Sequence, residues 1–218
     1  MRVDLSQGRV TLVVIDVQVL FAAEDGAFAN AAAGGMIAAI NELLEAARRA
    51  GVAVVHSRYV LRDDLRDAGL LAGQDLDLGA FRRSAPEAAV DPRVDVAAGD
   101  VHAEHNRPSA FFASDLDAVL RSLGTDRLIL CGLSVNNAIA ATARDAFARD
   151  IPCVVVREAT GPAPFEPAAD VEAAFRALDT WTAEVAALTN VIGRLAVGGP
   201  ETDRGSHTEE ETHAERTS

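Results

Sequence analysis

Short apolar runs alternate with amphipathic segments along most of this chain. The run Thr11–Val17, TLVVIDV, is unbroken and rich in β-branched residues, which predicts a strand buried on both faces, as in a parallel sheet. A helix is predicted over residues 35–50, because apolar positions recur on one face, two arginines fill the last turn and Gly51 follows. Residues 52–56 predict the second strand.

The same alternation returns after residues 58–100, which are charged and rich in glycine and proline. We expect this segment to be a long excursion over the strand ends, where loops often line sites. The further elements predicted in chain order are strand 101–104, a helix near 114–123 capped by Ser114, strand 127–132, helix 136–150, strand 152–156, a helix around 171–178, strand 184–188 and helix 191–195. This order predicts an α/β fold of three layers, with helices on both faces of a doubly wound, mostly parallel sheet.

We expect one folded domain over residues 1–197. Residues 198–218 are small, polar and acidic and lack an apolar period, so they predict a disordered acidic tail.

The charged residues narrow the range of possible functions. All 20 basic residues are arginine and 33 residues are acidic, so the chain of 218 residues carries a net charge of −13. This charge argues against nucleic-acid and anionic-membrane partners. The absence of lysine excludes a Schiff base or a lysine general base, since arginine stays protonated. No apolar run approaches the ~20 residues of a membrane span and no signal-peptide pattern opens the chain, so we expect a cytoplasmic protein.

Polar residues follow the predicted strands, where the site of a doubly wound sheet lies. Asp16 leaves the first strand there, and partial desolvation suits it to proton transfer. A structural carboxylate that caps a neighbouring loop explains the same position equally well. Gln18 lies on the same side, and His105 belongs to a segment that reaches the same edge, where it either hydrogen-bonds Asp16 or is an ordinary surface histidine.

The turn after strand 127–132 is a candidate for binding a substrate oxygen. Backbone N–H groups at a helix start bind anions, although every such turn has them, and this makes Ser134, Val135 and Asn137 candidate substrate-binding residues. Candidates for binding a substrate carboxylate are Arg58, Arg82, Arg83 and the less favoured Arg107. No dinucleotide fingerprint, P-loop or zinc-ligand spacing is present, so we expect no cofactor and no metal.

The chain contains VIDVQVLF near its start, RPSAFFASDLDAVL in its middle, and DRLILCG followed by ATARDAF. In order and spacing these stretches resemble the isochorismatase-like hydrolases, also called the cysteine hydrolase superfamily, from about residue 10 to residue 195. The resemblance implies a six-stranded sheet, a homodimer or larger homo-oligomer, and a small-molecule substrate such as an amide, a ureido compound or the vinyl ether isochorismate.

The resemblance also shows where the chain departs from the family's catalytic set of aspartate, lysine and cysteine. Asp16 matches the aspartate of the D-x-Q motif, with Gln18 and Phe21 in place. His105 stands at the lysine position and Ala138 at the position of the nucleophilic cysteine. The resemblance therefore implies a degenerate triad, in which the thioester route to amide hydrolysis is closed.

Two functions stay open. The first is a cysteine-free enzyme that acts on a small molecule by acid–base chemistry, with Asp16 as general acid or base, hydrolysing an enol ether or another activated bond or catalysing a rearrangement in a biosynthetic pathway. The second is an inactive pseudoenzyme that serves as a small-molecule binder or assembly partner. An active cysteine hydrolase is a distant third, because Cys131 and Cys153 lie in apolar strands where a thiol is inert.

The cavity separates the first two functions. An open, polar cavity over Asp16 and His105 favours catalysis or binding, whereas a cavity plugged by Phe81, Phe111 or Phe112 favours a scaffold. The subgroup within the family also stays open, because some stretches resemble the isochorismatases proper and VVREATG resembles the carbamoylsarcosine amidases.

Overall fold

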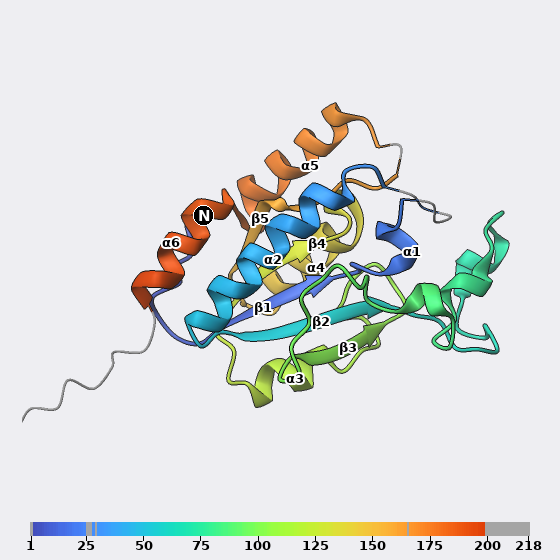
Figure 1. Ribbon diagram of the computed structural model, residues 1–218, viewed down its shortest axis with the longest axis horizontal. Coiled ribbons are helices and arrows are strands. Elements are labelled where there is room, and N and C mark those ends of the chain that lie inside the picture. Colours follow the sequence, from blue (N-terminus) through green and yellow to red (C-terminus); the bar gives the residue numbers. More distant parts are fainter. Residues whose placement is uncertain (1, 25–27, 29, 165, 199–218) are drawn as a thin grey trace, which may run out of the picture.

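The computed structural model describes residues 2–24, 28, 30–164 and 166–198, and its centre is a six-stranded, fully parallel β-sheet (Figure 1). The strands are β1 (Val10–Ile15), β2 (Ala53–Tyr59), β3 (Val101–His105), β4 (Arg127–Gly132), β5 (Cys153–Thr160) and β6 (Glu184–Ala186). They lie in the order β3-β2-β1-β4-β5-β6. The predicted doubly wound α/β fold is therefore confirmed, and the sheet is parallel throughout. Apart from Gly198, the predicted tail lies outside the described residues.

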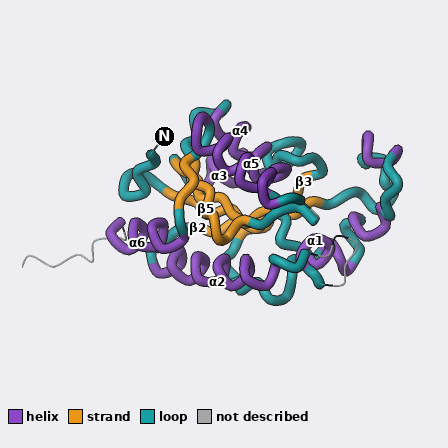
Figure 2. The backbone as a smooth tube through the Cα atoms, turned by 90° about the horizontal axis from the view of Figure 1, so that it is seen from above, coloured by secondary structure: helices purple, strands orange, loops and turns teal. Residues whose placement is uncertain are grey.

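Helices cover both faces of the sheet, as Figure 2 shows. The α-helices are α1 (Val19–Ala22), α2 (Ala33–Arg49), α3 (Leu116–Ser122), α4 (Ala140–Phe147), α5 (Ala168–Trp181) and α6 (Leu188–Gly198). Helices α2 and α6 pack on one face, and α3, α4 and α5 pack on the other. Both faces of β1 are consequently buried, which explains why its sequence is an unbroken apolar run. No helix within the described ranges has the length and apolar character needed to cross a bilayer.

Most predicted boundaries shift by a few residues, and three differences from the structure change the description of an element. The predicted helix 136–150 is divided into a π-helical turn, η4 (Val135–Ile139), and α4. Strand β5 continues four residues past the predicted end, to Thr160. Ser114 does not cap α3 in the predicted way: Asp115 is the N-cap and makes no side-chain cap, while the Ser114 hydroxyl donates to the Ala110 carbonyl and accepts from the Leu116 N–H.

The predicted excursion forms an arm that extends from the carboxyl edge of the sheet (Figure 1). The arm contains the short 3-10 turns η1 (Gly69–Gly73) and η2 (Leu78–Phe81), and a third such turn, η3 (Pro86–Ala88), follows the arm in the chain. Its two ends are joined at the base, because the Leu61 N–H donates to the Phe81 carbonyl at 2.7 Å and the Arg83 N–H donates to the Leu61 carbonyl at 2.8 Å. Residues 62–80, called the arm below, can therefore reach over the strand ends from a fixed base.

The strand order places the site between β1 and β4. The chain leaves β1 toward one side of the sheet and β4 toward the other, and this reversal opens a crevice at the carboxyl ends of the two strands. Ile15 pairs with Gly132 at this edge. Gly132 has φ +116°, and a Cβ there would lie 2.0 Å from the Ile15 carbonyl oxygen. Only glycine allows this close approach of the two strands.

We predict that Gly132→Ala destabilises the fold by roughly 2–4 kcal/mol, because the methyl group meets backbone and the φ value disfavours an L side chain. Urea unfolding followed by circular dichroism measures the change. The control is Gly35→Ala, since nothing lies within 4 Å of that added Cβ in helix α2. Equal stabilities of the two variants would contradict this account of Gly132.

Candidate active site

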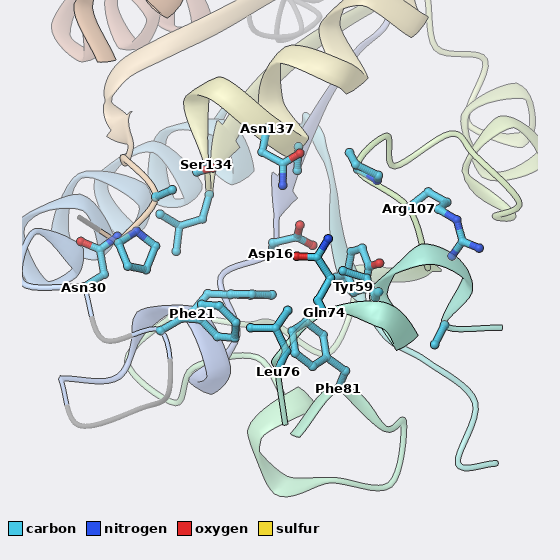
Figure 3. A pocket seen from close by; sticks show the side chains of 18 of the residues that line it. Asp16, Phe21, Asn30, Tyr59, Gln74, Leu76, Phe81, Arg107, Ser134 and Asn137 are labelled. Carbon is cyan, nitrogen blue, oxygen red and sulfur yellow. The ribbon is translucent and has the colours of Figure 1, made fainter. Parts of the chain in front are cut away.

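Asp16 lies at the floor of a cavity of about 860 Å³ at the carboxyl end of β1. It adopts a left-handed conformation, φ +56°, and its N–H donates to the Ser57 carbonyl at 2.9 Å. Aspartate tolerates this conformation better than most residues. The turn directs the carboxylate into the cavity, as Figure 3 shows, while only 7% of the side chain is exposed.

His105 lies behind Asp16 and holds it by a hydrogen bond. The His105 Nε2 is 2.9 Å from Asp16 Oδ1, and the His105 Nδ1 is 2.6 Å from the carbonyl oxygen of Arg107. A carbonyl only accepts hydrogen bonds, so Nδ1 carries a hydrogen. A second proton must then lie between Nε2 and Oδ1, and the pair is either imidazolium with carboxylate or neutral imidazole with carboxylic acid. Both forms have zero net charge, which suits a histidine side chain with no exposed surface.

The electrostatics favour a protonated His105. Burial alone lowers the pKa of His105, but the charge and hydrogen bond of Asp16 and the hydrogen bond to the Arg107 carbonyl outweigh burial, and the pKa rises above its ordinary value of 6.5. Within the described part of the chain, His105 is the one recorded hydrogen-bond partner of the Asp16 carboxylate. The second carboxylate oxygen is therefore available to a water or a substrate in the cavity.

The wall of the cavity is mainly aromatic and aliphatic. Its aromatic part is formed by Phe21, Phe28, Phe81 and Tyr59, whose rings meet at centroid distances of 5.6–5.9 Å. The arm contributes Leu70, Leu71, Gln74 and Leu76. Polar groups are few, and Figure 3 shows Asn30, Gln74, Ser134 and Asn137 among them around Asp16. The cavity therefore suits a small ligand with an apolar part and a few polar groups.

Phenylalanines do not plug the cavity. Phe81 belongs to its wall, Phe111 is buried on the opposite side of the sheet among α3, α4 and α5, and Phe112 is 55% exposed. The cavity is open, as catalysis or binding requires, but it is more apolar than expected.

Five of the predicted candidates besides Asp16 line the cavity: Phe21, Arg107, Ser134, Asn137 and Ala138. Ala138 presents its methyl group from the π-helical turn η4. The carbonyl of Ser134 holds this turn by accepting the N–H groups of Asn137 and Ile139, each at 3.1 Å. These hydrogen bonds of the turn involve main-chain groups and not the side chain at position 138.

Gln18 lies outside the cavity lining. It is fully buried, its Oε1 accepts the Tyr59 N–H at 2.7 Å, and its Nε2 donates to the carbonyls of Tyr59 and Ala88 at 3.0 and 2.9 Å. The structure therefore gives Gln18 a role in holding backbone rather than a place against a substrate.

The backbone N–H of Val135 and the side chains of Arg58 and Arg83 also have partners within the protein. The Val135 N–H donates to the Gly161 carbonyl at 3.0 Å, so this N–H cannot hold a substrate oxygen. Arg58 and Arg83 both pair with Glu104, each at 2.7 Å. Of the four candidate arginines, Arg107 alone lines the cavity. The predicted second strand ends at His56, three residues before the end of β2 in the structure. Tyr59 is therefore not among the predicted site residues.

The described residues contain no group of three or more His, Cys, Asp or Glu side chains arranged to hold a metal ion. The two cysteines are buried and free. Burial raises the pKa of Cys153 to about 12 and raises that of Cys131 as well. Neither thiol lines the cavity.

Comparisons with known proteins agree with the fold. The family model of the isochorismatase domain matches residues 10–190, so the chain belongs to the isochorismatase family. It is 28% identical over 183 residues to a ureidoacrylate amidohydrolase of Rhizobium rhizogenes, with 72% of each chain covered. It is 32% identical over 133 residues to a maleamate amidohydrolase of Pseudomonas putida, covering 59% of this chain and 62% of that protein.

Solved structures are similar over most of the chain. A cysteine hydrolase from Pseudomonas syringae pv. phaseolicola superposes with a TM-score of 0.83 at 26% identity, covering 87% of this chain and 93% of that one. An isochorismatase family protein from Desulfovibrio vulgaris has a TM-score of 0.77 at 28% identity, covering 87% of this chain and all of that one.

We predict that His105 stays doubly protonated above pH 6.5 in the folded protein, because Asp16 raises its pKa. Nitrogen-15 NMR of the imidazole measures its protonation against pH. In Asp16→Asn the raised pKa should fall, since the charge that raises it is gone. The raised pKa adds to stability below pH 6.5, and this contribution is lost as the pH rises through the folded-state value. A His105 that titrates identically in both proteins would rule out the pairing.

Proposed function

We propose that this protein is a thiol-independent hydrolase of small molecules in which Asp16 transfers the proton. The observation that carries the proposal is the Asp16–His105 pair at the floor of an open cavity, beside a methyl group at position 138. The cavity is open and reaches a buried carboxylate with one free oxygen. A protein that serves only as a scaffold needs neither feature. This arrangement therefore favours the enzyme over the pseudoenzyme.

The chemistry follows from the available groups. Asp16 accepts a proton from a water in the cavity, and the water oxygen attacks the substrate carbon without a covalent enzyme intermediate. With an enol ether the proton moves in the opposite direction. A protonated Asp16 gives its proton to a carbon of the enol ether, and water then adds. His105 holds the reacting carboxylate in one orientation and keeps the pair electrically neutral.

The substrate is small and has an apolar part that fits the aromatic wall. The relatives named above are amidohydrolases of ureidoacrylate and maleamate, so the bond that breaks is either an activated C–N bond of this kind or an enol ether C–O bond. Without a thiol, water itself is the nucleophile for either bond.

Asp16→Asn should lower kcat at least ~100-fold, because the amide cannot accept a proton. The measurement is a turnover screen by mass spectrometry with ureidoacrylate, maleamate, isochorismate, related enol ethers and simple amides. Asp150→Asn is the matched control, since Asp150 is exposed between α4 and the amino end of β5, at the edge of the sheet opposite the cavity. Equal turnover by Asp16→Asn and wild type would remove Asp16 from the mechanism, and no turnover by wild type would favour the pseudoenzyme.

Alkylation separates this mechanism from thiol catalysis. Iodoacetamide at pH 8 should leave wild-type turnover unchanged, because both thiols are buried with raised pKa values. Ala138→Cys should make the enzyme reactive, with one added carbamidomethyl group seen by mass spectrometry. Loss of wild-type turnover together with modification of Cys131 or Cys153 would contradict the proposal.

A further inference from the structure

Tyr59 ends strand β2 and belongs to the cavity wall beside the Asp16–His105 pair. Its ring packs edge-on against His105 at a centroid distance of 5.5 Å and against Phe81 at 5.8 Å. These two contacts fix the plane of the ring. The one part of the side chain left outside this packing is the hydroxyl group.

The backbone of Tyr59 is fixed as firmly as its ring. The buried Gln18 side chain binds both the N–H and the carbonyl of Tyr59, at 2.7 and 3.0 Å. Tyr59 also pairs with His105 across the parallel strands β2 and β3. The hydroxyl is thus carried on a side chain held from both ends, as expected of a group with a precise task at the cavity.

Tyr59 and Arg107 both line the cavity. Burial is the main influence on Tyr59 and raises its pKa above 10.0, while the charge of Arg107 and a side-chain hydrogen bond from it act in the opposite direction. The phenol therefore keeps its proton at neutral pH. A guanidinium only donates hydrogen bonds, so Arg107 does not compete for the O–H hydrogen of the phenol. Among the described residues, no recorded hydrogen bond has the Tyr59 hydroxyl as donor.

The other ionisable groups at the cavity can be compared with Tyr59 as possible proton donors. Among the described residues, the cavity lining contains three titratable side chains, Asp16, Tyr59 and Arg107. Arginine does not release a proton, and the chain has no lysine. His105 lies behind Asp16 with both ring nitrogens engaged. Within the described lining, Tyr59 is therefore the one titratable group besides Asp16 that can give up a proton.

We propose that Tyr59 is a second catalytic residue, which protonates the departing atom while Asp16 acts on the water. This proposal rests on the hydrolase function proposed above. For an amide, the water oxygen bonds to the substrate carbon, its proton goes to Asp16, and the electron pair of the breaking C–N bond goes to the nitrogen, which takes the Tyr59 proton. For an enol ether, Asp16 first gives its proton to carbon and then takes one from the water that adds, and the electron pair of the breaking C–O bond goes to the ether oxygen, which takes the Tyr59 proton. Arg107 stabilises the resulting tyrosinate, and proton exchange with solvent returns both groups to their starting states.

Tyr59→Phe tests the proposal, because it removes the hydroxyl and keeps the ring that packs on His105 and Phe81. For the amide or enol ether of the screen that wild type hydrolyses fastest, kcat should fall about 100-fold. For p-nitrophenyl acetate the rate should stay within about threefold, because nitrophenolate leaves without being protonated. A merely structural role would lower both rates alike.

Tyr59 is the one tyrosine of the chain, so the rise of tyrosinate absorbance at alkaline pH reports its pKa directly. Arg107→Gln should raise this pKa and Asp16→Asn should lower it, because Arg107 favours the anion and Asp16 disfavours it. Asp16→Asn is isosteric, which keeps this measurement usable if Arg107→Gln fails to fold. An unchanged titration in the folded variants would overturn the proposed placement of the hydroxyl.

The outcomes separate the two proposals. If Asp16→Asn is inactive and Tyr59→Phe keeps its rate on the amide or enol ether, the role of Tyr59 is wrong and the hydrolase proposal stands. If wild type hydrolyses nothing in the screen, both proposals fall. Selective loss in Tyr59→Phe together with opposite shifts of the tyrosine titration supports the acid role.

Discussion

The proton shared by Asp16 and His105 is the constraint on which the rest of the site depends. An isolated carboxylate buried at the end of a parallel strand is costly, and one beside a neutral partner is poorly compensated. The 2.9 Å contact makes the pair neutral as a unit while leaving one carboxylate oxygen facing the cavity. The Arg107 carbonyl completes the arrangement, because it fixes which ring nitrogen of His105 meets Asp16.

His105 stands where the family resemblance implies an amine, and an imidazole at this position changes what the site can do. An ammonium group offers three donors and keeps its charge, whereas His105 offers one donor to Asp16 and can give up its proton nearer to neutral pH. The carboxylate is consequently less heavily solvated by protein groups and freer to exchange protons with a ligand. This difference fits a site that relies on proton transfer and has no thiol to activate.

Much of the fold was predictable because the strands are buried on both faces. Unbroken apolar runs such as Thr11–Val17 and residues 127–132 are distinctive, and they also place Asp16 and the turn after β4 at one edge of the sheet. Residue pattern does not reveal which polar side chains are engaged by the protein itself. Gln18 and Arg58 stand at suitable positions, yet buried carbonyls and Glu104 engage them.

In the turn η4, main-chain hydrogen bonds hold the backbone, whereas the side chain of residue 138 lines the cavity. This division of roles has an evolutionary consequence. Contacts between main-chain groups hold the turn, and the buried Ala138 adds one methyl group to the core beside the cavity, so a side chain at position 138 must be small. Selection for stability therefore exerts little pressure on the identity of that small side chain. Another small side chain with a different functional group can stand there without disturbing the main-chain contacts of the turn, while the carboxylate across the cavity keeps its surroundings.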